Sequence, residues 1–129
     1  MVVDTSALVA ILLIESDSER FLDALVDASH VRISAATAVE FSIVAIARAG
    51  VEAETKVDLL FARCGAEIVP VNEAQALMAR NAFRTFGKGR HPAALNFGDC
   101  FSYALAKAAN EPLLYKGEDF RKTDLRSVL

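Results

Sequence analysis

Short apolar runs alternate along the chain with longer segments whose apolar residues recur at helical spacing. Runs that are apolar throughout suit strands that are buried on both faces, as in a parallel sheet. Pro70 within the third run indicates that this strand lies at an edge of the sheet or ends there. Strands are predicted at residues 1–3, 30–34, 67–71 and 112–116, with a last edge strand at 125–129.

The segments between these runs predict helices. In the clearest stripe, Val57, Leu60 and Cys64 lie on one face, and Gly65 ends the helix. Because strands alternate with helices, the sequence predicts an α/β fold with a mainly parallel sheet covered on both faces. Helices are expected over residues 4–14, through 21–26, and over 36–49, 52–64, 73–86 and 98–109.

Composition and charge narrow the class of protein. The 129 residues are 53% apolar, which excludes a disordered chain and suits one domain, 1–129, with a single core. No apolar run approaches the ~20 residues of a membrane-spanning helix, and no basic segment precedes the run 7–14, so we expect a cytoplasmic protein without membrane contact. Cys64 and Cys100 lie far apart in the sequence and are expected to be small core residues. The net charge of −3 argues against general coating of nucleic acid but leaves room for a local basic patch.

Acidic residues follow the predicted strands or begin the helices after them. Asp4 follows the first strand, and Glu118 and Asp119 follow the fourth. Asp99 lies in the first turn of the helix at 98–109, and Glu40 lies early in the helix at 36–49. Because parallel strands end at one edge of a sheet, we expect these acids to lie near one another at the edge where such sheets bind ligands.

Each acid also has a purely structural explanation. Asp4 can cap the helix that follows it, and Asp99 is stabilised by the positive end of its own helix. Glu40 can close a capping box with Thr37, although Ser34 is an equally good cap one turn earlier. The two acids after the last strand are common turn residues.

The joint occurrence of these acids is harder to explain by local structure alone. Several carboxylates close together cannot all stay ionised unless a cation is bound. A ligand set made only of oxygen atoms suits Mg²⁺ or Mn²⁺, which would activate water and stabilise charge on a phosphate. The pattern therefore predicts a metal-dependent hydrolase of phosphodiester bonds.

Two other classes of protein remain open at this point. In a non-catalytic, receiver-like regulatory domain, an aspartate at the end of a strand accepts phosphate and Lys116 senses it. In a metal-dependent phosphomonoesterase, the aspartate forms a covalent intermediate. Thr5 and Ser6 stand after Asp4 where further acids are expected in these two classes, which argues against both.

The sequence also resembles a known family, the PIN domain, and more narrowly the VapC toxins of bacterial type II toxin–antitoxin pairs. The resemblance covers essentially the whole chain. It implies a three-layer α/β/α sandwich, a magnesium-dependent endoribonuclease, a VapB-type antitoxin that blocks the site, and a toxin homodimer. It is carried by residues 3–8, by Glu40 after residues 34–37, and by residues 95–100 and 113–120.

The same resemblance assigns roles to the acids. It makes Asp4, Glu40 and Asp99 the acidic core, with Asp4 and Asp99 as direct metal ligands. Glu40 binds the metal through water or orients the attacking water. The fourth acid falls at Glu118 or Asp119. Asp119 is chosen because it directly precedes Phe120, and Glu118 replaces what is often Asp or Asn in the family.

Further polar residues are candidates for contact with substrate. Ser6 matches a polar position of the family and is expected to hold a metal-bound water or a phosphate. Lys88, Arg90 and Lys116 are candidate contacts to the RNA backbone, although Lys88 and Arg90 also suit a solvated loop. The apolar helix at 36–49 is a candidate surface for the second toxin copy or the antitoxin.

Overall fold

Four parallel strands form the central sheet of the structure, a computed structural model that describes residues 1–129. Their order in the sheet is β3-β2-β1-β4, so the predicted edge position of the third strand is confirmed. All pairings are parallel, and the carboxyl ends of the strands therefore share one edge. The strands are β1 (Val2–Val3), β2 (Arg32–Ser34), β3 (Glu67–Val69) and β4 (Leu113–Leu114).

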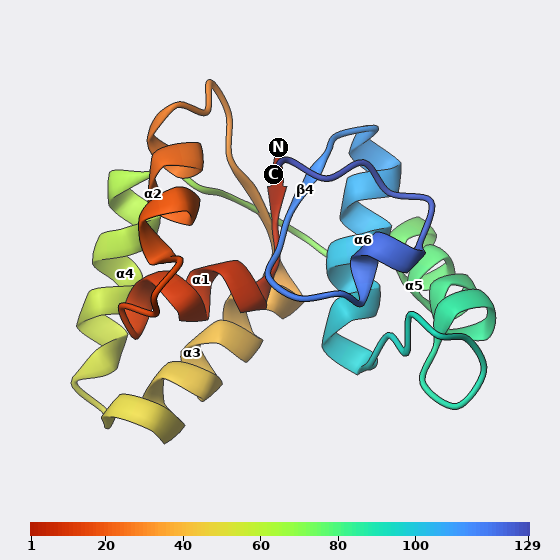
Figure 1. Cartoon of the computed structure of the whole chain (residues 1–129), viewed down its shortest axis with the longest axis horizontal. Helices are drawn as coiled ribbons and strands as arrows, with labels where there is room; N and C mark the ends of the chain where they lie inside the picture. The colour runs from red at the N-terminus through yellow and green to blue at the C-terminus, as the bar shows by residue number, and fades with distance from the viewer.

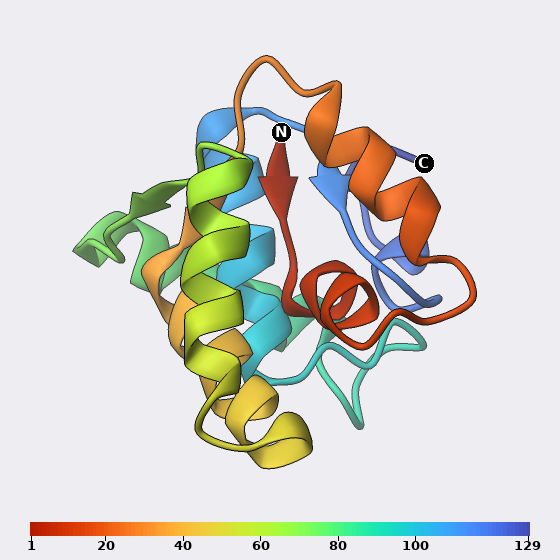
Figure 2. The same cartoon turned by 90° about the vertical axis from the view of Figure 1, so that its left-hand side faces the viewer.

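Helices cover both faces of this sheet, which confirms the predicted three-layer α/β/α sandwich (Figure 1). One face packs against α1 (Thr5–Leu12), α2 (Ser18–Val26), α3 (Ala35–Ala49) and α4 (Ala53–Arg63). The other face packs against α5 (Glu73–Phe86) and α6 (Phe97–Ala109). A short 3₁₀ helix, η1 (Phe120–Lys122), follows β4. Figure 2 shows α4 on one side of β1 and β4, with α2 on the other side and α1 below them.

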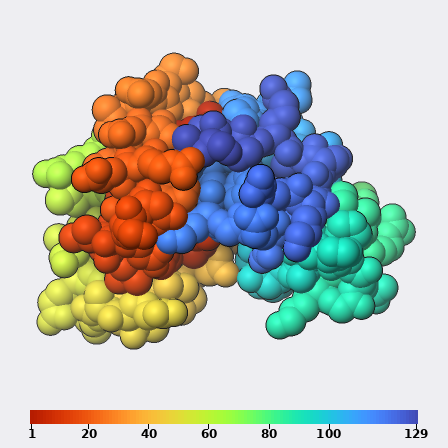
Figure 3. Space-filling model, in the orientation of Figure 1, coloured from red at the N-terminus to blue at the C-terminus, as the bar shows by residue number.

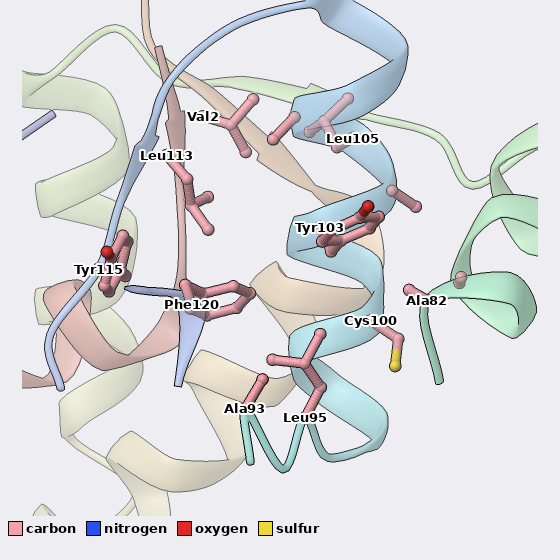
Figure 4. Close-up of a cluster of buried hydrophobic side chains, with 13 residues drawn as sticks. Val2, Ala82, Ala93, Leu95, Cys100, Tyr103, Leu105, Leu113, Tyr115 and Phe120 are labelled. Carbon is pink, nitrogen blue, oxygen red and sulfur yellow. The ribbon is translucent and has the colours of Figure 1, made fainter. Parts of the chain in front are cut away.

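Alternate strand residues fill the two halves of the core. Val2 pairs with Leu113, and both face α6, where they join the cluster that includes Tyr103 and Leu105 (Figure 4). Their neighbours in β1 and β4 belong to the cluster on the other face, with residues of the first four helices. The period of two along each strand thus explains why the apolar runs have no polar position.

The strands are shorter than the sequence predicts. β3 ends at Val69 because the next residue, Pro70, has no N–H to give to a sheet. β4 ends at Leu114, and the N–H of Lys116 turns to a side chain instead. The predicted last strand at 125–129 is wrong, since only a single parallel bridge joins Ser127 to Leu113.

The helices follow the predicted ranges to within a few residues, and no helix of the structure is long and apolar enough to cross a membrane. The two cysteines are free thiols. Cys100 lies in the core beside α5, and Cys64 packs at the edge of the core on the opposite face. Their predicted role in packing is confirmed.

Candidate active site

Asp4 lies where β1 turns into α1, and only 2% of its surface is exposed. Its Oδ2 accepts hydrogen bonds from the N–H and the hydroxyl of Ser6, at 2.9 and 2.6 Å. Asp4 is therefore the cap of α1, as the structural explanation predicts. Its Oδ1 is buried without any hydrogen-bond partner, which is costly for a carboxylate. A cation is one group that can satisfy this oxygen.

Asp99 lies in the first turn of α6 and forms a capping box with Asn96, with hydrogen bonds of 2.8 and 2.9 Å. Burial raises the pKa of the Asp99 carboxyl to about 7, although its hydrogen bond from the Asn96 N–H acts in the opposite direction. The negative charges of Asp4, Asp119 and Glu40 raise this pKa further. The fold therefore brings three acids close enough for their charges to act on the Asp99 carboxyl.

Glu40 lies half-buried on α3, where its carboxylate is held between two other elements. The hydroxyl of Thr5, at the start of α1, donates to Oε2 at 2.5 Å. The carboxylate also lies against Gly98 of α6, and a β-carbon at this position would overlap it. Glu40 is thus fixed beside the residue that precedes Asp99.

The alternative capping box between Thr37 and Glu40 is wrong. The helix begins at Ala35 with Ser34 in the cap position, so Thr37 is already inside the first turn. The Thr37 hydroxyl instead contacts the hydroxyl of Ser102 on α6, at 3.1 Å. This contact joins α3 to α6 one turn beyond Asp99, and it supports the approach of Glu40 to the start of α6.

The structure separates the two candidates for the fourth acid. Glu118 is exposed and pairs with Arg121 at 3.1 Å. Asp119 is also exposed, but its charge acts on Asp99. Phe120, which follows Asp119, is buried against Tyr115 with ring centroids 5.2 Å apart and anchors the turn. This arrangement favours Asp119.

Ser6 and Lys116 connect the start of α1 to the segment after β4. The Ser6 hydroxyl donates to Asp4 and accepts from the N–H of Lys116 at 3.0 Å. The ammonium of Lys116 pairs with Glu15 and with Asp17, the latter at 2.6 Å. Both residues therefore have structural partners, and the predicted contact of Lys116 with RNA requires this ion pair to open.

Lys88 and Arg90 lie exposed in the turn between α5 and α6. Backbone hydrogen bonds order this turn, among them one of 3.0 Å from the Lys88 N–H to the carbonyl of Leu95. Nδ1 of His91 accepts from the backbone N–H of Ala93, so its ring has a structural partner. The two cations have no ion-pair partner, and they remain candidates for contact with phosphate.

The donor set fits a hard divalent cation. The four acids offer only oxygen atoms, and the adjacent Cys100 thiol donates to the carbonyl of Asn96 while burial raises its pKa to about 11. The acids do not form a group of three or more that could hold a metal ion as they stand. Mg²⁺ commonly binds to one or two carboxylates and keeps several waters, so it does not require a larger group of acids.

Sequence reasoning missed three residues that shape the site: Thr5, Asn96 and Gly98. Asn96 and Asp99 have the spacing of a capping box, which is a readable signal. A glycine inside the first turn of a helix is a weaker signal of close approach by another group. No local signal connects Thr5 to Glu40, because the two residues meet only in the folded chain.

Segments from distant parts of the chain thus converge at one edge of the sheet. In the space-filling view, the N-terminal segment, the start of α3 and the C-terminal region adjoin there (Figure 3). A parallel sheet with helices on both faces and acids gathered beyond its strand ends is the arrangement of a PIN domain.

Comparison with known proteins supports this class. The sequence matches the family model of the PIN domain over residues 1–125. It is 52% identical over 129 residues to Ribonuclease VapC30 of Mycobacterium tuberculosis, with 99% of this chain and 98% of that protein covered. The chain belongs to the PIN-domain family, and within it to the VapC group.

Solved structures share the fold at low sequence identity. The crystal structure of VapC20 of M. tuberculosis, described as a sarcin–ricin loop cleaving toxin, matches with a TM-score of 0.81 and 15% identity, covering 98% of this chain and 97% of that chain. A toxin–antitoxin complex from Klebsiella pneumoniae matches with a TM-score of 0.70 and 17% identity, covering 95% and 92%. These likenesses concern the fold alone.

Proposed function

We propose that this protein is a magnesium-dependent endoribonuclease that hydrolyses phosphodiester bonds in RNA as the toxin of a toxin–antitoxin pair. The observation that carries the proposal is the convergence of four carboxylates, one of which, Asp4, keeps a buried oxygen without a partner. Relatives named VapC ribonucleases support RNA as the substrate.

Asp4 and Asp99 are the residues that hold the metal. Oδ1 of Asp4 is free to bind a cation, while Oδ2 stays bonded to Ser6. Asp99 becomes a ligand once its proton is lost, which a cation favours. When bound, Mg²⁺, or Mn²⁺ in its place, supplies Lewis acidity, which lowers the pKa of water and offsets charge on the reacting phosphate.

The remaining side chains position water and RNA. Glu40, held beside the start of α6, would bind the ion through water and orient the attacking water, whose proton it takes. Asp119 is exposed to solvent and completes the acidic set when the substrate arrives. Lys88 and Arg90 contact the RNA backbone without reading its bases.

The direct test is cleavage of RNA by the purified protein with and without Mg²⁺. Wild-type protein is expected to cleave only with the metal, and Asp99→Asn is expected to lower the rate at least about a hundredfold. The amide keeps an acceptor oxygen for the Asn96 N–H, so the fold should be retained. Full activity of a folded Asp99→Asn variant would remove Asp99 from the site.

A VapB-type antitoxin and a second copy of the chain are the proposed protein partners. The solved toxin–antitoxin complex with the same fold supports the first. On α3, Val39 and Ile43 are 60% and 61% exposed beside a hollow of about 370 Å³, and this apolar face is a candidate contact surface. Co-expression with the antitoxin is expected to abolish cleavage.

No observation favours the two other classes of protein. A phosphate-sensing role needs a lysine free to approach Asp4, but Lys116 is paired with Glu15 and Asp17. A phosphomonoesterase needs a second carboxylate next to the nucleophile, where Ser6 instead donates to Asp4. Hydrolysis of a phosphomonoester without any cleavage of RNA would revive the second class.

A further inference from the structure

Glu40 lacks the local support that the other buried acids have. Asp4 is fixed by Ser6 two residues away, and Asp99 is fixed by Asn96 three residues away. Glu40 projects from the second turn of α3 on a flexible side chain, and its hydrogen-bond partner, Thr5, is 35 positions away in the sequence. Its place in the site therefore depends on contacts between elements.

Two such contacts hold its carboxylate. The Thr5 hydroxyl donates to Oε2, which fixes the rotation of the carboxylate as well as its position. The missing side chain of Gly98 leaves the space that Oε1 occupies at the start of α6. Asp99 follows Gly98 directly, and the charge of the Glu40 carboxylate acts on the Asp99 carboxyl.

We propose that Thr5 is a positioning residue for Glu40, whose carboxylate its hydroxyl holds in the recess at Gly98 for use in the metal-assisted reaction. The catalytic role that this inference gives to Glu40 rests on the proposed function. The Thr5 hydroxyl donates a hydrogen bond to Glu40 and acts on the reaction only through this carboxylate. The recess at Gly98 admits the carboxylate only while no side chain fills it.

The central test is the variant Thr5→Val, which keeps the shape of the side chain and removes the hydroxyl. We expect kcat for RNA cleavage to fall about ten- to hundredfold with little change in KM, because the loss of such a supporting hydrogen bond disturbs the metal site and not the binding of RNA. Thr5→Ser restores a donor and is expected to recover activity. Thr55→Val, on the exposed side of α4, is the matched control and is expected to leave kcat unchanged.

A double-mutant cycle shows whether Thr5 acts through Glu40. In a Glu40→Gln background, Thr5→Val is expected to cause no further loss of kcat, because the carboxylate that it positions is absent. An equal loss in both backgrounds would overturn the proposal, and so would failure of Thr5→Ser to recover activity. If Thr5→Val does not fold, Gly98→Ala tests the same recess from its other wall and is expected to lower kcat similarly.

A binding measurement separates this inference from the proposed function. Calorimetric titration with Mn²⁺ alone is expected to give about tenfold weaker binding for Thr5→Val than for wild-type protein. If wild-type protein does not cleave RNA, the proposed function fails, but weaker Mn²⁺ binding still supports the role of Thr5. If wild-type protein cleaves RNA and Thr5→Val matches it in both kcat and Mn²⁺ binding, the inference fails and the function stands.

Discussion

In the absence of a cation, two influences act in opposite directions on the protonation of the Asp99 carboxyl. As the partner of Asn96 in a capping box it is favoured as a carboxylate, but burial and three neighbouring acids favour its protonated form. The second influence is larger, so its pKa lies at about 7 instead of its ordinary 3.8. The protonation of this one residue therefore couples folding, metal binding and pH.

The first consequence concerns stability without Mg²⁺. The folded chain binds the Asp99 proton more tightly than the unfolded chain does. The contribution of this proton to the free energy of unfolding is therefore fully present below pH 3.8 and is lost as pH rises through about 7. Since the carboxyl is partly exposed, we expect a loss on the order of 1–2 kcal/mol. Thermal unfolding of wild-type protein and Asp99→Asn should therefore diverge between about pH 4 and pH 7, with the variant gaining relative stability as pH rises. Parallel pH curves would contradict the raised pKa.

The second consequence concerns metal affinity. Mg²⁺ must displace the proton from Asp99, so the apparent affinity is expected to rise about tenfold per pH unit below pH 7 and to level off above it. Calorimetry across this range, with proton release followed in buffers of different ionisation enthalpy, measures the effect. Affinity that is independent of pH would show that Asp99 is not a ligand.

At the scale of elements, the hydroxyl of Ser6 joins α1 to the segment that carries Asp119. It bonds to Asp4 on one side and to the N–H of Lys116 on the other. Ser6→Ala is expected to lower the free energy of unfolding by about 1–2 kcal/mol, because it leaves the part-buried Lys116 N–H without its partner. Chemical denaturation measures this loss. The control is Ser42→Ala, because the Ser42 hydroxyl bonds only within α3. This replacement is expected to lower the free energy of unfolding by at most about 0.5 kcal/mol. Equal losses for the two variants would contradict the linking role.

The elements also show what the sequence could and could not predict. The positions of the helices and of four strands follow from apolar spacing, and the acids at the strand ends follow from the parallel arrangement. The partner of Glu40 could not be predicted, because Thr5 reaches it only when α1 packs on α3. The ion pairs of Lys116 with Glu15 and Asp17 could likewise not be predicted, since they join segments about a hundred residues apart.

For the whole molecule, a net charge of −3 means that RNA must approach through a small basic region. Binding should therefore weaken steeply with salt. Combined Lys88→Gln and Arg90→Gln replacement is expected to reduce the slope of log affinity against log salt concentration by about 1–2, measured in the Asp99→Asn background to prevent cleavage. Lys56→Gln, an exposed lysine on α4, should leave the slope unchanged. An unchanged slope for the double variant would place the RNA elsewhere on the surface.

Asp4 caps the start of α1 and Asp99 completes the capping box at the start of α6, each with the same carboxyl group that is offered to the ion. Replacing either one with a residue that lacks an acceptor oxygen removes both the metal ligand and a hydrogen bond of the scaffold, so the folding of such a variant must be measured beside its activity. The Glu40 carboxylate caps no helix, and its hydrogen-bond partner is Thr5. Substitution of Glu40 is therefore expected to abolish RNA cleavage while the fold is retained. Such a variant could be used to capture an uncut RNA or an antitoxin.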